Sequence, residues 1–335
     1  MRPAQSTGDA RNVAPMSRAG VTDQDEEAAM STVPDTWSTS DTEVIARAVI
    51  EAPSIHDTQP WNLRLPARTA ELEERVEFAA PGPDPLRPDR LISCGAAVAN
   101  LELGIRALGW STRTLLLPEP ERPELIARIE AAAPATPSST DLGSFAAISH
   151  RRSHRESFAR IPVPATTIAD VMAAADIPGV RVRLLASDEA PALADMLTYS
   201  AEAMRRNPHY QREMFRWTSH WHPEGNAEVV TDWGADLDAG GAAGRALITT
   251  GVPDTAELAA AIDRETVLVF SVQSADPIDL VRVGIASERA WLAAVDARLS
   301  ASVLTYPLRV EDSAARLAER MDLDGLPQLI MRIGF

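Results

Sequence analysis

Two stretches of this chain, residues 94–118 and 283–307, can be aligned with each other without a gap. Each reads as a helix followed by a strand, and the identical positions are Gly95/Gly284, Ala97/Ala286, Leu103/Leu292, Ser111/Ser300, Leu115/Leu304 and Pro118/Pro307. The order helix, proline, strand also recurs, at residues 45–65 and at residues 168–185. Internal similarity of this kind indicates a structural unit that occurs twice. We therefore predict an α+β fold of two tandem lobes that form a pseudo-dimer within one chain.

The composition along the chain suggests where these lobes begin and end. The length of 335 residues suits two lobes of ordinary domain size. Residues 1–41 are rich in small, polar and acidic side chains without apolar periodicity, which predicts a disordered leader. Residues 131–143 are rich in Pro, Ser, Thr and Ala and are predicted to be a linker. We expect one lobe at residues 42–143 and the other at residues 144–335.

Hydrophobic periodicity predicts the regular elements of both lobes. Helices are expected at residues 42–51, 94–108, 166–175, 187–217 and 277–299. Strands are expected at residues 62–65, 75–79, 112–117, 180–186, 266–272, 301–305 and 328–333.

The net charge of −16 argues against nucleic acids and anionic membranes as partners, because both need a concentrated basic surface. The chain contains no Lys, so an anion site must use Arg, backbone amides or helix N-termini. Its single cysteine, Cys94, excludes an intrachain disulfide, and the spacing of the six histidines does not indicate a metal site. No signal peptide or membrane-spanning run is recognisable, which predicts a soluble cytoplasmic protein.

Residues 52–61, Ala-Pro-Ser-Ile-His-Asp-Thr-Gln-Pro-Trp, lie between a predicted helix and a predicted strand. Proline and small polar residues at such a junction offer backbone amides and side-chain donors from a fixed loop, which suits a flat polar ligand. The alternative is an ordinary helix-to-strand connection that ends at a proline.

Residues 150–158, His-Arg-Arg-Ser-His-Arg-Glu-Ser-Phe, form the second candidate segment. Guanidinium groups bind phosphate through paired hydrogen bonds, and a serine hydroxyl adds another. The alternative is a solvated basic turn that balances an acidic protein, although Phe158 and Ile161 favour anchoring against a core.

The other candidates favour structural roles. The tryptophans at positions 217, 221 and 233 could form a lid but are more typical of a core. Cys94 opens an apolar helix and is interpreted as a packing residue. Neither a nucleophile elbow nor a Gly-rich phosphate loop is recognisable, so no catalytic side chain is assigned.

Taken together, the two segments resemble nitroreductase-type flavoproteins. Residues 53–61 resemble the family's Pro-Ser-x-x-Asn-x-Gln-Pro-Trp loop, and residues 151–155, with Phe158 and residues 161–164 behind them, resemble its Arg-Arg-Ser segment. In ordinary members both motifs lie in one chain, and each FMN site of the homodimer takes one motif from each subunit. Here each half of the chain has one motif. The resemblance, which extends over residues 42–335, is to the double-lobed, Acg-like branch and implies a nitroreductase-like fold with one complete flavin site.

The resemblance also implies roles for individual residues. Arg151, Arg152, Ser153 and Arg155 would bind the phosphate, ribityl chain and pyrimidine edge of FMN, and the isoalloxazine would be lined by Pro53, Ser54, Asp57 and Gln59. Glu224 and Gly225 resemble a turn whose backbone amide faces the flavin N5. The implied function is an FMN-dependent oxidoreductase that transfers hydride through the flavin to or from a small organic substrate such as an aromatic or quinone. NAD(P)H is the expected electron donor, and a pseudo-dimeric monomer the expected state.

Asp57 departs from the family pattern, because a carboxylate only accepts hydrogen bonds where the usual asparagine also donates them. The chain also ends at Phe335, where most members continue into a basic tail, and weaker anchoring of the phosphate is therefore expected. Two alternatives remain open from the sequence: a protein that binds or sequesters flavin without turnover, and a site that no longer binds flavin.

Overall fold

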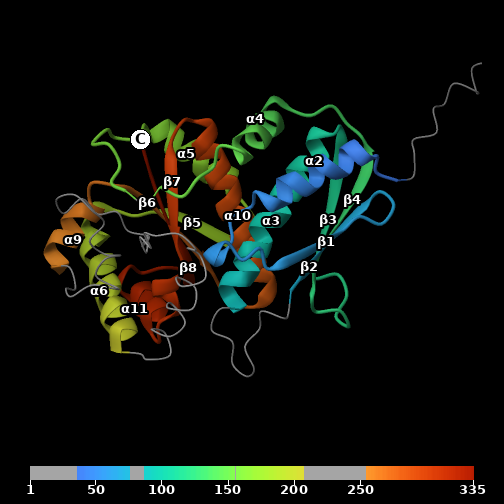
Figure 1. Cartoon of the computed structure of the whole chain (residues 1–335). Coiled ribbons are helices and arrows are strands. Elements are labelled where there is room, and N and C mark those ends of the chain that lie inside the picture. Colours follow the sequence, from blue (N-terminus) through green and yellow to red (C-terminus); the bar gives the residue numbers. More distant parts are fainter. Residues whose placement is uncertain (1–35, 76–86, 155, 207–253) are drawn as a thin grey trace, which may run out of the picture. The chain divides into compact units, whose positions relative to one another are not determined.

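The computed structural model describes residues 36–75, 87–154, 156–206 and 254–335, and residues 36–335 form one compact unit (Figure 1). The first described helix, α2 (Thr39–Ile50), begins before the end of the predicted leader. Its N-terminus is a capping box, in which the Ser38 side chain accepts a hydrogen bond from the backbone N–H of Asp41 and the Asp41 side chain accepts one from Ser38.

The first sheet contains β1 (Trp61–Arg64), β2 (Thr69–Glu74), β3 (Trp110–Leu116) and β4 (Leu125–Pro134), in the antiparallel order β1-β2-β4-β3. Helix α3 (Arg87–Ala107) connects β2 to β3 and is longer than predicted. Strand β2 was not predicted, and the strand predicted at residues 75–79 lies, apart from Arg75, outside the described residues.

The predicted linker at residues 131–143 is wrong. Strand β4, which was not predicted, extends to Pro134, and the core buries Leu125, Ile126, Ala127 and Ile129 in its first half. Helix α4 (Ser139–Ile148) follows, and its N-terminus is a second capping box, formed by Ser138 and Asp141.

The second sheet contains β5 (Val180–Leu184), β6 (Thr266–Val272), β7 (Ser300–Leu304) and β8 (Leu326–Gly334), in the antiparallel order β5-β6-β8-β7. The helices around it are α5 (Ala165–Ala174), α6 (Ala190–Arg206), α9 (Thr255–Ile262), α10 (Pro277–Asp296) and α11 (Ser313–Arg320), of which α9 and α11 were not predicted. Both sheets therefore have the same strand order, with a long helix between the second and third strands. This confirms the predicted α+β class with two tandem sheets.

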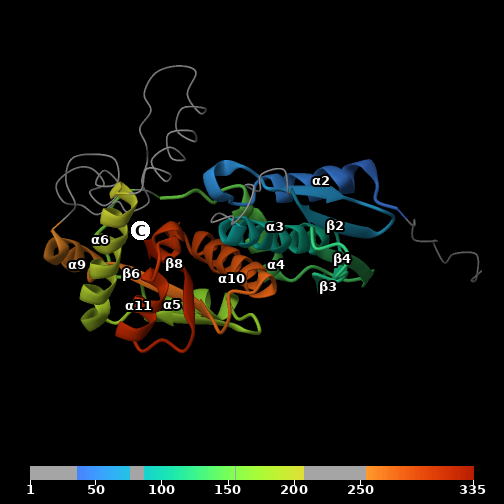
Figure 2. The ribbon, with the colours of Figure 1, turned by 90° about the horizontal axis from the view of Figure 1, so that it is seen from below.

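Helices α3 and α10 lie side by side between the two sheets (Figure 2). They cross at Gly95 and Gly284, which are equivalent in the alignment of the two halves. A Cβ atom built on Gly95 would lie 2.1 Å from the carbonyl oxygen of Val281, and one built on Gly284 would lie 2.0 Å from that of Ile92. Contacts exchanged in this reciprocal way are the signature of a two-fold axis, here an approximate one within one chain.

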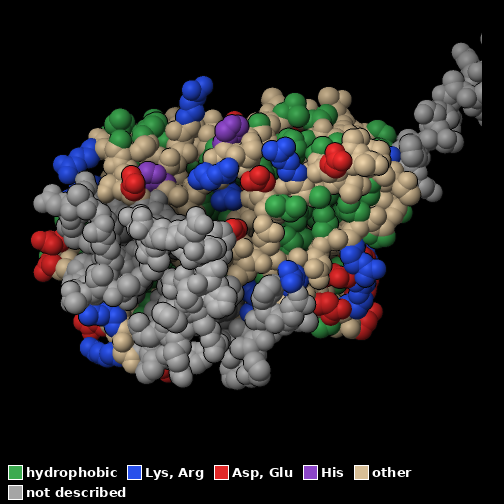
Figure 3. Space-filling model, viewed as in Figure 1, with side chains coloured by type: hydrophobic (Ala, Val, Ile, Leu, Met, Phe, Trp, Pro, Cys, Tyr) green, Lys and Arg blue, Asp and Glu red, His purple; other side chains and the backbone are tan. Residues whose placement is uncertain are grey.

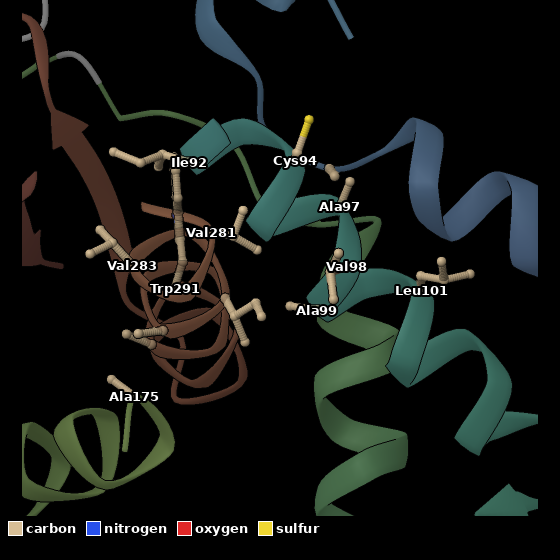
Figure 4. Packing of buried hydrophobic residues seen from close by; sticks show 14 of the residues in the cluster. Ile92, Cys94, Ala97, Val98, Ala99, Leu101, Ala175, Val281, Val283 and Trp291 are labelled. Atoms are coloured by element: carbon tan, nitrogen blue, oxygen red, sulfur yellow. The ribbon is translucent and has the colours of Figure 1, made fainter. Parts of the chain in front are cut away.

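Side chains of both helices fill the core around this crossing (Figure 4). One hydrophobic cluster extends along the chain from Trp37 to Ile333 and contains residues of both sheets. Cys94 is fully buried in it, and its Sγ lies 3.5 Å from the carbonyl oxygen of Pro60. Burial raises the pKa of the thiol far above its usual range, as expected for a packing residue.

Among the described residues, no helix is both long and apolar enough to cross a membrane.

Candidate functional site

The loop between α2 and β1 has an unusual backbone. His56, Asp57 and Gln59 have positive φ angles of 50°, 54° and 45°. Non-glycine residues rarely adopt this left-handed region, and each costs on the order of 1 kcal/mol or more unless the surrounding structure holds it. Such clusters of strained residues occur most often at binding sites.

Hydrogen bonds to two serines hold the loop in this conformation. The Ser54 Oγ accepts a hydrogen bond from the backbone N–H of Gln59 at 3.0 Å. The Ser93 Oγ, on α3, accepts one from the backbone N–H of Ile55, also at 3.0 Å, and donates to the carbonyl oxygen of Asp89 at 2.7 Å. Ser93 was not predicted as a site residue.

The predicted flavin-facing side chains of the loop differ in exposure. Asp57 is exposed, whereas Pro53, Ser54 and Gln59 are half-buried. The Gln59 side-chain amide donates to the carbonyl oxygen of Ile50 at 3.3 Å, which ties it to the end of α2. In this loop the Asp57 carboxylate is exposed, whereas the side chains of Ser54 and Gln59 make hydrogen bonds within the protein.

The Arg-Arg-Ser segment follows α4 and is anchored on the second sheet. Ser153 forms a parallel bridge with Ala301 of β7, and the backbone N–H of His154 donates to the Ala301 carbonyl at 2.9 Å. Phe158 packs over the guanidinium of Arg332 and fills the space above Gly334, where a Cβ atom would lie 2.4 Å from the ring. This confirms the predicted anchoring for Phe158, whereas the prediction is wrong for Ile161, which is 58% exposed to solvent.

Arg151 joins this segment to the opposite half of the chain. Its side chain is buried, and one terminal nitrogen donates to the carbonyl oxygen of Glu51 at 2.7 Å. Glu51 is the C-cap residue of α2, two positions before Pro53. The structure therefore brings the two candidate segments together, although they lie about 100 residues apart in sequence.

Arg152 and Ser153 lie at the surface beside this junction. The side chain of Arg152 is 69% exposed, and one terminal nitrogen lies 4.0 Å from the Glu51 carboxylate and 2.6 Å from the Arg151 carbonyl oxygen. Ser153 is also exposed. On the face seen in Figure 3, arginine and acidic side chains are interspersed over the described residues.

Several predicted residues lie outside the described residues, namely Arg155, Glu224 and Gly225 and the three tryptophans of the suggested lid. Conversely, Glu288 and Trp291, which α10 places against Arg151, were not predicted as site residues. Glu288 could have been noticed in the sequence as an acidic residue on an otherwise apolar face of the helix predicted at residues 277–299.

Burial lowers the pKa of His56 below its ordinary value of 6.5, and the nearby Asp89 opposes this effect. The folded protein then binds fewer protons than the unfolded chain below about pH 6.5. We therefore expect the contribution of His56 to stability to be complete above this pH and to be lost as the pH falls toward the lowered pKa. Urea unfolding of the wild type and His56→Gln at pH 5.5 and 7.5 would test this. The variant should lose less stability on acidification than the wild type, and an equal loss in both would contradict it.

The chain is similar to two proteins of Mycobacterium tuberculosis that carry provisional NAD(P)H nitroreductase names. It is 28% identical to Rv3131 over 290 residues, which cover 85% of this chain and 82% of that protein. It is 26% identical to Acg over 312 residues, which cover 90% of this chain and 91% of Acg. No family model matches the chain.

Among solved structures, the chain is similar to an FMN-bound nitroreductase from Bacteroides fragilis, at a TM-score of 0.37 and 12% identity over 57% of this chain and 87% of that one. The FMN-dependent nitroreductase NfnB from Mycobacterium smegmatis, solved with NADPH, gives a TM-score of 0.37 and 12% identity over 58% of this chain and 87% of NfnB.

The sequence similarities to these two proteins agree with the two motifs and with their junction in the structure. The similarity to Acg extends over nearly the whole of both chains.

Proposed function

We propose that this protein is an FMN-dependent oxidoreductase that takes electrons from NAD(P)H and reduces a small organic acceptor such as an electron-poor aromatic compound or a quinone. The observation that carries the proposal is the hydrogen bond from Arg151 to the Glu51 carbonyl, which joins the Arg-Arg-Ser segment to the end of α2 just before the Pro-Ser loop. The provisional nitroreductase names of Rv3131 and Acg support the same class.

The residues at this junction fit FMN in their chemistry. The exposed guanidinium of Arg152 and the exposed hydroxyl of Ser153 are donors suited to a phosphate group. Opposite them, the loop at residues 53–59 offers a backbone held in a strained conformation, as expected of a site that orients a rigid ring. Arg155, Glu224 and Gly225 complete the proposed set.

When bound, FMN supplies the hydride chemistry, so the protein needs no acid or base of its own. The part of the protein is to orient the ring with the Pro-Ser loop and to hold the phosphate with the Arg-Arg-Ser segment. The Asp57 carboxylate is negatively charged and disfavours the negative charge that FMN would gain on reduction. Asp57 would therefore lower the reduction potential of bound FMN.

The visible spectrum of the purified protein, with and without added FMN, is the direct test. We expect about one FMN per chain, because each half of the sequence supplies one of the two motifs. Rapid mixing with NADPH or NADH without oxygen should then bleach the flavin absorbance.

Two other results would contradict the proposal in different ways. Bound FMN that neither nicotinamide reduces would indicate a protein that sequesters flavin without turnover. A colourless protein that takes up no added FMN would indicate a site that no longer binds flavin.

A further inference from the structure

A buried carboxyl group lies next to the junction of the two motifs. Glu288 of α10 is 0% exposed, and within the described part of the chain neither of its carboxylate oxygens has a hydrogen-bond partner. The Arg151 Nε lies 3.4 Å from its Oε1, and the Arg151 guanidinium lies 4.8 Å from the ring centroid of Trp291, one turn further along α10. A carboxyl group buried in this way is costly unless a charge or proton compensates it.

The same cluster holds the C-terminal end of α2. Arg151 donates to the carbonyl oxygen of Glu51 at 2.7 Å, and the Asn100 Nδ2 of α3 donates to that of Ala48 at 3.0 Å. These carbonyls belong to the last turn and cap of α2, where the helix leaves them without internal partners and where positive charge is favourable. Directly after this cap the chain enters the strained loop that begins at Pro53.

The pseudo-two-fold axis provides an internal comparison. The gapless alignment of the halves pairs Asn100 with Arg289 and Trp291 with Glu102. Arg289 and Glu102 form a direct ion pair of 2.7 Å across α10 and α3. At the equivalent positions on the other side of the axis, Asn100 instead donates to the Ala48 carbonyl and Trp291 lies against Arg151, whose counter-ion is Glu288. The two sides thus use equivalent positions differently, and the side with Arg151 is the one that faces the Pro-Ser loop.

We propose that Glu288 is a positioning residue, which orients the Arg151 guanidinium toward the Glu51 carbonyl and so holds the Pro-Ser loop in its strained conformation. Its importance for flavin binding rests on the proposed function, whereas its effect on the loop does not. Burial raises the pKa of Glu288 to about 7, against the opposing influence of Arg151 and Asn100. Above this pH the carboxylate is charged and pairs with Arg151, and below it the pairing weakens.

Hydrogen exchange of the ligand-free protein tests the proposal directly. Glu288→Gln keeps the shape of the side chain and removes its charge. At pH 8 we expect protection factors of the amides at residues 54–59 to fall about tenfold, the effect of losing one hydrogen bond of ordinary strength. At pH 6, where wild-type Glu288 is largely protonated, the difference between the two proteins should shrink. If Glu288 affected only the global stability of the protein, the protection of the loop amides would not depend on pH in this way.

Glu102→Gln is the matched control, because it removes the buried carboxylate at the other side of the axis and leaves Arg151 untouched. It should not change the protection of the amides at residues 54–59. Equal protection of the loop in Glu288→Gln and Glu102→Gln at pH 8 would overturn the proposal. If Glu288→Gln does not fold, Arg151→Met/Glu288→Met replaces both charges with apolar groups, a change that buried ion pairs often tolerate. Full loop protection in this folded double variant would also overturn it.

Titration with FMN then separates this inference from the proposed function. We expect Glu288→Gln to weaken FMN binding about tenfold at pH 8, in proportion to the loss of loop protection. In the Arg151→Met background it should have no further effect, because Glu288 acts through Arg151. A wild type that binds no FMN, with a loop that still loosens in Glu288→Gln, would contradict the proposed function and leave the positioning role supported.

Discussion

Replacing Gly284 by alanine should lower the free energy of unfolding by about 3 kcal/mol, as expected when a well-packed core must accept an extra methyl group. The added Cβ would lie 2.0 Å from the carbonyl oxygen of Ile92 and 2.8 Å from the Cα of Gly95, so backbone and not a flexible side chain has to move. Helices α3 and α10 can relieve this contact only by separating, which loosens the core that both sheets share. The improved helix propensity of alanine, about 1 kcal/mol, offsets a minor part of the loss. Urea unfolding followed by far-UV circular dichroism measures the change.

The approximate two-fold symmetry extends this prediction to the equivalent glycine, Gly95. Gly95→Ala should destabilise by a similar amount, because its Cβ would lie 2.1 Å from the Val281 carbonyl oxygen. The double variant should lose less than the sum, since one separation of the helices relieves both contacts. Gly104→Ala, on the same helix α3, is the control: its Cβ would lie 3.3 Å from the Ala48 Cβ, and the change should be close to neutral. Wild-type stability in Gly284→Ala would show that α3 and α10 do not cross at these glycines.

The double variant Arg151→Ala/Ser153→Ala should lose FMN, with a Kd at least about 100-fold weaker than that of the wild type. Hydrogen bonds to a charged group contribute about 1.5–3 kcal/mol each, and about 1.4 kcal/mol corresponds to a factor of ten in Kd. Ser153 offers an exposed hydroxyl beside the junction, and Arg151 holds that junction to the end of α2. Quenching of FMN fluorescence during titration measures the Kd.

Two further variants separate loss of the site from loss of the fold. Arg181→Ala removes an arginine of β5 whose side chain is 61% exposed and pairs with Asp324, and it should retain full FMN affinity. Arg152→Ala/Ser153→Ala leaves the buried Arg151 in place, so it should keep the wild-type melting temperature and still bind FMN at least about 10-fold more weakly. Equal FMN loss in Arg181→Ala and the Arg151 double variant would place the flavin elsewhere.

The internal alignment anticipated more of the fold than the individual elements did. It pairs Gly95 with Gly284, and these two residues make the reciprocal contacts at the crossing of α3 and α10. Local patterns placed β6 correctly at Thr266–Val272 and most other elements within a few residues. They failed at β4, where a composition rich in Ala and Pro was taken for a linker, because the burial that makes Leu125–Pro134 a strand comes from its neighbours in the sheet.

For the site, the Pro-Ser loop and the Arg-Arg-Ser segment are each recognisable from local residue types, and so is their distribution, one in each half of the chain. How the two segments meet depends on the folded arrangement of Arg151, which is buried and bonded to Glu51, and of Glu288, to which no motif pointed. The physical reason is that a charge on a helix acquires its role from the groups that the fold packs against it. Those groups come from parts of the chain that sequence spacing cannot place.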